Sequence, residues 1–309
     1  MYQFVYWLLS LVAAAAPARY VPMKAVATYI GEARCLECHG QENKHFSETL
    51  HARTFRLHPA NALQARGCEA CHGAGSEHAK NATDKTALVG FTKSWDSPVA
   101  AQNAQCLTCH DGGNRMQWAG SRHDKSKMSC ADCHNTMQQA STNSLLARKT
   151  ISETCAQCHR EQRADFRKRS HMPLPEGKIS CADCHNPHGS TSKSLLVADS
   201  VNDVCYTCHT EKRGPMLWEH APVRENCANC HLPHGSNHDK LLVAARPYLC
   251  QQCHDLPVGH NGTFYRDGQT AAGALLGGGQ SPRIIGRTCQ NCHSQIHGSN
   301  HPAGARFQR

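Results

Sequence analysis

Ten short motifs of the form Cys-x-x-Cys-His run through the sequence and account for all twenty of its cysteines. They begin at Cys35, Cys68, Cys106, Cys130, Cys155, Cys181, Cys205, Cys227, Cys250 and Cys289. Two thiols at this spacing can form thioethers with the two vinyl groups of one haem, and the histidine that follows can bind its iron. The motifs therefore predict ten covalently bound c-type haems.

Each motif defines three residues of a haem site. The thioether-forming cysteines are Cys35 and Cys38, Cys68 and Cys71, Cys106 and Cys109, Cys130 and Cys133, Cys155 and Cys158, Cys181 and Cys184, Cys205 and Cys208, Cys227 and Cys230, Cys250 and Cys253, and Cys289 and Cys292. The proximal iron ligands are His39, His72, His110, His134, His159, His185, His209, His231, His254 and His293. The sequence predicts no catalytic residue.

Three other uses of paired cysteines compete with haem attachment. Cys-x-x-Cys pairs also hold zinc, form disulfides and act as thioredoxin-like redox pairs. None of these uses requires a histidine directly after the second cysteine, whereas all ten motifs have one. Because haem is attached to c-type cytochromes outside the cytoplasmic membrane, the motifs also predict a periplasmic protein.

Thirteen further histidines could supply the second, distal ligand of each iron. Bis-histidine ligation leaves no coordination position for a substrate and therefore suits electron transfer. His188 and His234 follow a proximal histidine by three residues, so each should bind a different haem from that neighbour. The other histidine candidates are in register with the repeat or follow at looser spacings: His123, His171 and His220, then His51, His78, His260 and His297.

One position departs from this pattern. Where two repeats have His188 and His234, the repeat that begins at Cys130 has Met137. Methionine is a known axial ligand that raises the reduction potential of a haem, so Met137 is the tenth distal candidate. The alternative is that Met137 only packs, and that one of the histidines outside the repeat binds this iron. Those are interpreted as surface or propionate-contacting residues: His45, His58, His238 and His301.

The composition is too poor in core-forming residues for an ordinary domain of this length. Hydrophobic residues make up 39% of the 309 positions, but twenty of them are cysteines, and aromatic residues make up 6%. A bound cofactor must therefore supply much of the interior. The spacing of the motifs leaves room only for a helical turn and a connecting loop at each. The predicted fold is a multihaem cytochrome c, haem-cored and elongated, with short α-helices, loops and almost no sheet.

An internal repeat organises the middle of the chain. The segments 181–190 (CADCHNPHGS) and 227–236 (CANCHLPHGS) are each followed by Leu-Leu-Val-Ala, and a weaker copy begins at Cys130. No long Pro, Ser or Gly linker interrupts the motifs. We therefore expect one decahaem domain over residues 19–309, with doubled motifs that are clearest over 130–254.

The N-terminus and the charge bear on location and partners. An apolar run from Phe4 to Ala16, ending in small residues, predicts a signal peptide over residues 1–18, although positive charge is lacking before it. A misassigned start or an uncleaved anchor is the alternative.

The formal net charge is +9, but the basic residues are scattered, and one cluster (Arg163, Arg167, Lys168 and Arg169) fits a solvated face. No nucleic-acid partner is expected.

The motifs also carry a family resemblance. The stretch NDVCYTCHTEKRGPMLWEHAPVRENCANCHLPHGS (202–236), the stretch CQNCHSQIHGSNHP (289–302) and the order of all ten motifs resemble the periplasmic decahaem cytochromes of porin–cytochrome conduits, the MtrA and DmsE type. The resemblance implies a wire held inside an outer-membrane β-barrel porin. It implies partners on both sides: periplasmic or inner-membrane cytochromes, and an extracellular multihaem cytochrome or terminal reductase serving metal respiration or iron oxidation.

The resemblance also implies histidine as the distal ligand at nine of the ten candidates, and this family has histidine where the present chain has Met137. Two other functions compete with the conduit. A freely diffusing periplasmic electron shuttle has the same haem chemistry. A multihaem reductase of the nitrite-reductase kind needs an open distal site, often marked by lysine in place of a proximal histidine, and all ten motifs here end in histidine.

Overall fold

The computed structural model describes residues 26–254, 289–302 and 304–307. The predicted signal peptide and the candidate ligand His260 lie outside the described residues. The α-helices are α1 (Glu32–Leu36), α2 (Gly40–Phe46), α3 (Leu50–Leu57), α4 (Glu69–His72), α5 (Ser76–Lys80), α6 (Val99–Leu107), α7 (Arg122–Lys125), α8 (Cys130–Cys133), α9 (Ile151–Cys155), α10 (Arg160–Asp165), α11 (Val201–Tyr206), α12 (Ala221–Glu225) and α13 (Tyr248–Gln251).

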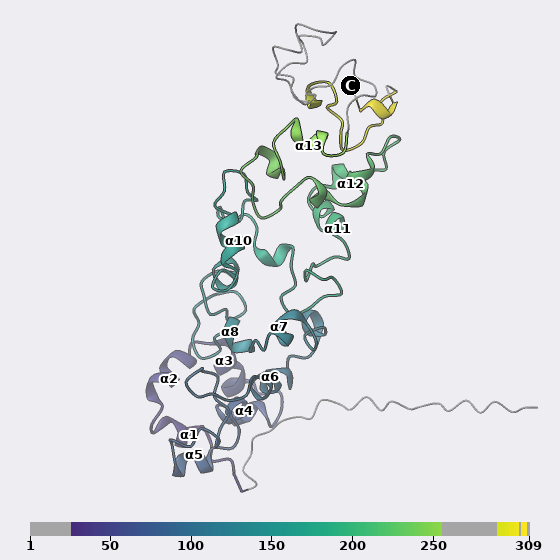
Figure 1. Cartoon of the computed structure of the whole chain (residues 1–309). Helices are drawn as coiled ribbons and strands as arrows, with labels where there is room; N and C mark the ends of the chain where they lie inside the picture. The colour runs from purple at the N-terminus through teal and green to yellow at the C-terminus, as the bar shows by residue number, and fades with distance from the viewer. Residues whose placement is uncertain (1–25, 255–288, 303, 308–309) are drawn as a thin grey trace, which may run out of the picture. The chain divides into compact units, whose positions relative to one another are not determined.

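Single turns of 3-10 helix lie between them. These are η1 (Gln64–Arg66), η2 (Gly113–Arg115), η3 (Cys181–Asp183), η4 (Thr210–Lys212), η5 (Cys227–Asn229), η6 (Asp239–Leu241), η7 (Cys289–Asn291) and η8 (Gly304–Arg306). The described ranges contain no strand, only isolated bridges, and Figure 1 shows short helices joined by loops. The prediction of short helices and loops with almost no sheet is confirmed. None of the helices in these ranges is long and apolar enough to cross a bilayer.

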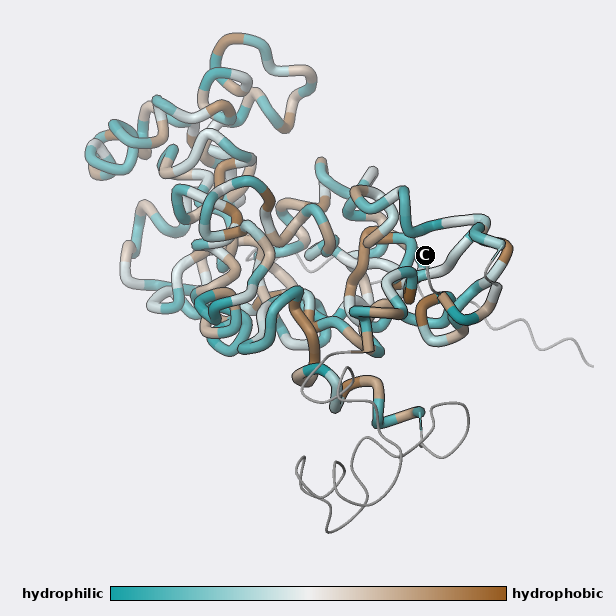
Figure 2. The backbone as a smooth tube through the Cα atoms, turned by 90° about the horizontal axis from the view of Figure 1, so that it is seen from above, coloured by the Kyte–Doolittle hydropathy of each residue, from teal (hydrophilic) through white to brown (hydrophobic). Residues whose placement is uncertain are grey.

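Apolar side chains form only a small part of the interior. Eleven apolar residues are buried in the described part of the chain, and five of them are alanine. Along the backbone, hydrophobic segments are short and alternate with hydrophilic ones (Figure 2). Side chains alone therefore do not supply a core of ordinary size for this length.

The chain divides into two compact units. The first comprises the residues up to Arg115 together with Asp124–Ala147, and the second comprises Met116–His123 together with the residues from Arg148 onward. Each unit contains several complete motifs, so the sites are described within each unit. The expectation of a single decahaem domain stays a prediction.

Local sequence explains where the helical turns begin. Ser129 and Ser180 form capping boxes with the aspartates three residues later, directly before the motifs at Cys130 and Cys181. Thr150 caps α9 in the same way, through Glu153. These side chains satisfy backbone N–H groups that the first helical turn leaves without a partner. A turn of helix is thereby started at or just before the cysteines.

Candidate haem sites

All ten motifs fold into the same single turn. In each, the backbone N–H of the histidine donates to the carbonyl of the first cysteine, at N–O distances of 2.9–3.1 Å. This is the i to i−4 hydrogen bond of an α-helix, which places residues i and i+4 on one face. The first cysteine and the proximal histidine are therefore presented together, as attachment of one haem requires.

Counted from the N-terminus, the even-numbered motifs orient the proximal histidine in a common way. The Nδ1 atom of each even-numbered proximal histidine lies 2.5–2.8 Å from a backbone carbonyl oxygen. A ring that donates from Nδ1 keeps Nε2 deprotonated and directed away, which is the state that binds a metal. The pairs are His72 with Val89, His134 with Ser144, His185 with Ser194, His231 with Lys240 and His293 with Arg306.

The residue directly before the Leu-Leu pair of each repeat supplies three of these carbonyls, and the Leu-Leu segment packs back along the motif. It returns antiparallel to the motif, with bridges from His134 to Leu146, His185 to Leu196 and His231 to Leu242. The first leucine of each copy has a positive φ of 52–59°, which is rare for leucine and turns the preceding carbonyl toward the ring. The returning segment of the repeat therefore orients the ring of the proximal histidine.

Six proximal histidines each face a second histidine at a nearly constant distance. The ring centroids are 5.9–6.2 Å apart, and every partner is one of the predicted distal ligands. The pairs are His39 with His78, His110 with His51, His159 with His123, His185 with His234, His231 with His297, and His254 with His220.

The separation fits two imidazoles bound to one iron. A metal–imidazole bond is about 2 Å long and the ring centroid lies about 1 Å behind the nitrogen, so two rings on opposite sides of one metal have centroids about 6 Å apart. Nδ1 of His51 and of His78 is buried without a hydrogen-bond partner among the described residues. The facing histidines and the adjacent thiols therefore fit a haem held between the two rings.

The distal rings lie in surroundings that keep them neutral. Burial lowers the pKa of five of them: His51, His78, His220, His234 and His297. An aromatic side chain packs on four of these rings, with centroids 5.4–5.6 Å apart: Phe55 on His51, Trp95 on His78, Phe307 on His220 and Phe166 on His234. Neutral imidazole is the form that binds iron, and the aromatic contact limits the orientations of the ring.

Successive motifs form five doublets: the first with the second, the third with the fourth, and likewise to the ninth with the tenth. The two motifs of a doublet contact each other through their first cysteines. In all five doublets the two first thiols interact, as at Cys106 and Cys130, whose contact lowers the pKa of Cys106 and raises that of Cys130. The contact with Cys155 lowers the pKa of Cys181 to about 7. These values describe the free thiols before haem attachment. The contacts place the first cysteines of each doublet side by side.

A polar residue three positions before the first cysteine of an odd-numbered motif contacts the other half of its doublet. The sequence analysis did not identify these residues; the signal was a polar residue at the same offset in four of the five doublets. Oε1 of Glu32 lies 3.5 Å from Sγ of Cys68, and Ser152 forms a hydrogen bond with Cys181. Asn103 accepts from the N–H of Cys130 at 2.9 Å, and Asn202 accepts from the N–H of Cys227 at 2.7 Å.

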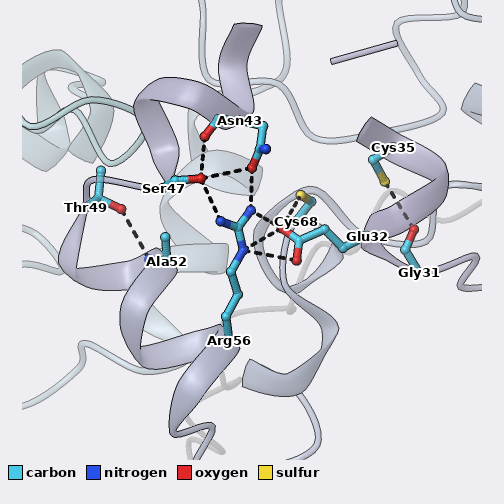
Figure 3. A network of polar contacts seen from close by, with 9 residues as sticks. All are labelled: Gly31, Glu32, Cys35, Asn43, Ser47, Thr49, Ala52, Arg56 and Cys68. Carbon is cyan, nitrogen blue, oxygen red and sulfur yellow. Dashed lines mark hydrogen bonds and ion pairs between the residues drawn. The ribbon is translucent and has the colours of Figure 1, made fainter. Parts of the chain in front are cut away.

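Glu32 is held in place by a network of polar contacts. Arg56 donates to Glu32 from Nη2 at 2.6 Å and from Nε at 3.1 Å, and its Nη1 donates to Ser47 at 2.8 Å (Figure 3). These bonds lower the pKa of Glu32. An ionised carboxylate therefore lies beside the first cysteine of the second motif, and burial together with this carboxylate raises the pKa of that thiol, Cys68, to about 12.

Replacing Asn202 with alanine should destabilise the seventh and eighth haem sites. The buried Asn202 amide donates to Val223 and Arg224 carbonyls at 2.9 and 3.0 Å and accepts from Cys227. Loss of these bonds leaves partly buried backbone groups without their partner, at a cost of about 1–3 kcal/mol. We expect a lower urea midpoint for the haem-loaded protein. Alanine at the exposed Asn143 is the matched control, and equal midpoints for the two variants would contradict the role of Asn202.

Neighbouring doublets meet at the second cysteines instead. Burial and the nearby Cys109 raise the pKa of Cys71 to about 11. Cys184 with Cys208 and Cys230 with Cys253 interact in the same way, and burial and its partner raise the pKa of Cys184 and of Cys230. Within each unit, the contacts along the chain thus alternate between first and second cysteines.

Three further distal candidates make hydrogen bonds to nearby groups of the chain. Nδ1 of His171 lies 2.6 Å from the Lys168 carbonyl oxygen and Nε2 lies 3.1 Å from Glu176, and these two bonds raise its pKa. The backbone N–H groups of Met137 and His188 each donate to an asparagine two residues earlier at 3.1 Å. These three and His260 stay predicted ligands.

The basic cluster contains two ion pairs with nearby carboxylates. Lys168 is 2.7 Å from Asp165, and Arg169 is 2.7 Å from Asp239. The pair of Arg169 is exposed, as expected for a solvated face, and the pair of Lys168 is half-buried. Among the residues that the structure describes, no three His, Cys, Asp or Glu side chains form a metal-binding cluster, and no disulfide joins the cysteines.

Comparison with known proteins places these sites in context. Residues 171–214 and 220–257 match the family model for the doubled CXXCH motif, and residues 68–158 match that of the NrfB-like cytochrome c-type protein. The chain is 43% identical to the multiheme cytochrome MtrA of Shewanella baltica over 90% of its own length and 81% of the relative.

Two more distant relatives share parts of the chain. The cytochrome c-type protein NrfB of Escherichia coli is 31% identical over 43% of this chain and 68% of its own length. The C-type polyheme cytochrome OmcB of Geobacter sulfurreducens is 28% identical over 53% of this chain but only 21% of its own length. These relatives are c-type cytochromes, and the haem-attachment motifs described above agree with covalently bound haem c and electron transfer.

Proposed function

This chain belongs to the family of the multihaem cytochrome MtrA, and on that premise we propose that it carries electrons across the outer membrane inside a β-barrel porin. Its partners would be periplasmic or inner-membrane cytochromes on one side and an extracellular multihaem cytochrome or terminal reductase on the other. Each haem, when bound, supplies one iron that is reversibly oxidised and reduced by one electron. The motifs provide for ten such groups.

The facing histidine pairs are the observation that carries the proposal. In six sites a distal ring lies about where the second bond to iron requires it. Residues that fill both axial positions leave no place for a substrate to bind the metal. This arrangement supports a carrier rather than a multihaem reductase.

The alternation of cysteine contacts supports a continuous path. Within each unit, the first cysteines of a doublet lie near each other, and the described contacts with the next doublet are between second cysteines. Haems attached to these cysteines would then be close to the neighbouring haems of the same unit, which suits short tunnelling steps in sequence. The barrel location is supported by the similarity to MtrA over most of both chains.

The proposal is tested with the native complex. A barrel protein should co-purify with the cytochrome from outer membranes, and liposomes that contain both proteins should reduce an encapsulated redox dye when a reductant is added outside. Liposomes with the barrel alone, or with the cytochrome added outside without it, are the controls and should be many-fold slower. Equal rates without the barrel, or the absence of any co-purifying barrel, would favour the freely diffusing shuttle.

A further inference from the structure

Two distal ligands of the second unit share one offset. His234 follows the eighth motif and faces His185 of the sixth, and His297 follows the tenth motif and faces His231 of the eighth. In both pairs, a ligand that follows an even-numbered motif serves the even-numbered motif before it. We propose that Met137, which follows the fourth motif, is the distal ligand of the second haem, whose proximal ligand is His72.

The backbone around Met137 matches that of the histidine repeats. The residue after the proximal histidine donates to the first leucine of the returning segment at 2.7 Å in all three copies, from Asn135, Asn186 and Leu232. Met137 and His188 then make the same turn, each donating its N–H to an asparagine side chain at 3.1 Å. The repeats differ in sequence from Thr136, which stands in place of Pro187, and Gln138 stands in place of Gly189. The backbone of Met137 therefore has the same local conformation as that of the distal candidate His188.

Among the described residues, the second site has no distal histidine in a facing pair. His78, which follows the second motif, faces His39 of the first. His72 is half-buried and is oriented by the Val89 carbonyl on one side, and it makes a T-shaped contact with the Phe91 ring, with centroids 5.3 Å apart. In the first unit, the histidines outside the motifs and pairs are His45 and His58, and both are exposed, whereas Met137 is half-buried. The offset and the burial point to the same ligand.

Thioether ligation would make the second haem the high-potential site of the first unit. A thioether is a weaker donor than imidazole and favours ferrous iron. The proposal rests on haem attachment but not on the barrel, so it is tested on the purified cytochrome. Oxidised wild-type protein should show a near-infrared methionine-to-iron charge-transfer band, and its redox titration should contain one component above the rest.

Three variants test the ligand. Met137→His should lose the band and the high-potential component, and should bind no carbon monoxide when reduced. Met137→Leu should lose the band and bind about one carbon monoxide per chain, since one axial position is then open. Met128→Leu, nine residues earlier, should retain both features. A wild-type protein without the band, or a band that survives in Met137→His, would overturn the proposal.

A second pair of variants tests which haem is involved. Cys68→Ser with Cys71→Ser should remove the second haem together with the band, whereas Cys106→Ser with Cys109→Ser should remove the third haem and keep it. The opposite result would assign Met137 to another site. Should either variant fail to accumulate, nuclear Overhauser contacts in the reduced full-length protein can link the Met137 methyl, through one porphyrin, to the thioether protons of Cys68 and Cys71 or to those of another motif.

Discussion

Replacing His234 with alanine is expected to open one haem to carbon monoxide. The His234 ring faces His185 at 6.1 Å and packs against Phe166 at 5.5 Å, so its removal leaves the sixth iron with one axial ligand. A five-coordinate ferrous haem binds carbon monoxide, whereas one with two imidazole ligands does not. The reduced variant should take up about one molecule per chain, against almost none for the wild type. Carbon monoxide difference spectra measure this directly.

His238 provides the matched control. It lies four residues further along the same segment and is absent from the facing pairs. His238→Ala should leave carbon monoxide uptake at the wild-type level. Uptake by several haems of the wild type would instead indicate open distal sites and revive the reductase interpretation. Unchanged uptake in His234→Ala would show that this ring is not an iron ligand.

A chain that never receives haem should fail to fold. The longest described helix, α6, has nine residues, and isolated helices shorter than about 12–15 residues are marginal in water. The eleven buried apolar side chains are too few to offset the loss of conformational entropy over the described length. We expect the haem-free chain to lose most of its helical circular dichroism and to be digested far faster by protease than the mature protein.

Expression without the signal peptide, where haem is not attached, supplies the haem-free chain. The haem-loaded protein under the same reducing conditions is the control, because it separates the loss of haem from any effect of reduced thiols. A cooperative thermal unfolding transition in the haem-free chain would contradict this prediction. It would mean that side chains alone define the fold.

The sequence was sufficient for the parts of the site that are local in the chain. Cys-x-x-Cys-His is one helical turn wherever it occurs, and the structure has that turn at all ten motifs. Position relative to the motifs, together with the family resemblance, also predicted the six distal histidines that the described part of the chain brings opposite a proximal one, including His51 and His297 at looser spacings. Short helices without sheet followed from the small number of residues for each motif.

Long-range features could not be predicted in the same way. The pairing of His51 with His110 across 59 positions, or of Asn202 with the Cys227 backbone, depends on how the loops fold back. The sequence around Phe166 does not predict its contact with His234, because an isolated phenylalanine is more often a residue of the hydrophobic core. His171 shows the converse, since its place in the repeat predicts a ligand while the structure pairs it with Glu176.

The two-motif offset of the facing rings has a consequence for how such chains change in length during evolution. In five of the six facing pairs, a histidine after one motif reaches a site of the same parity, odd or even, two motifs away, so these doublets share ligands with adjacent doublets. The exception is His78, which follows the second motif and faces His39 of the first. Loss of one motif would exchange odd and even positions downstream and leave rings of the five pairs facing the wrong partners. Insertion or loss of a whole doublet preserves the parity. Gene duplication is therefore expected to lengthen or shorten such a chain in steps of two haems.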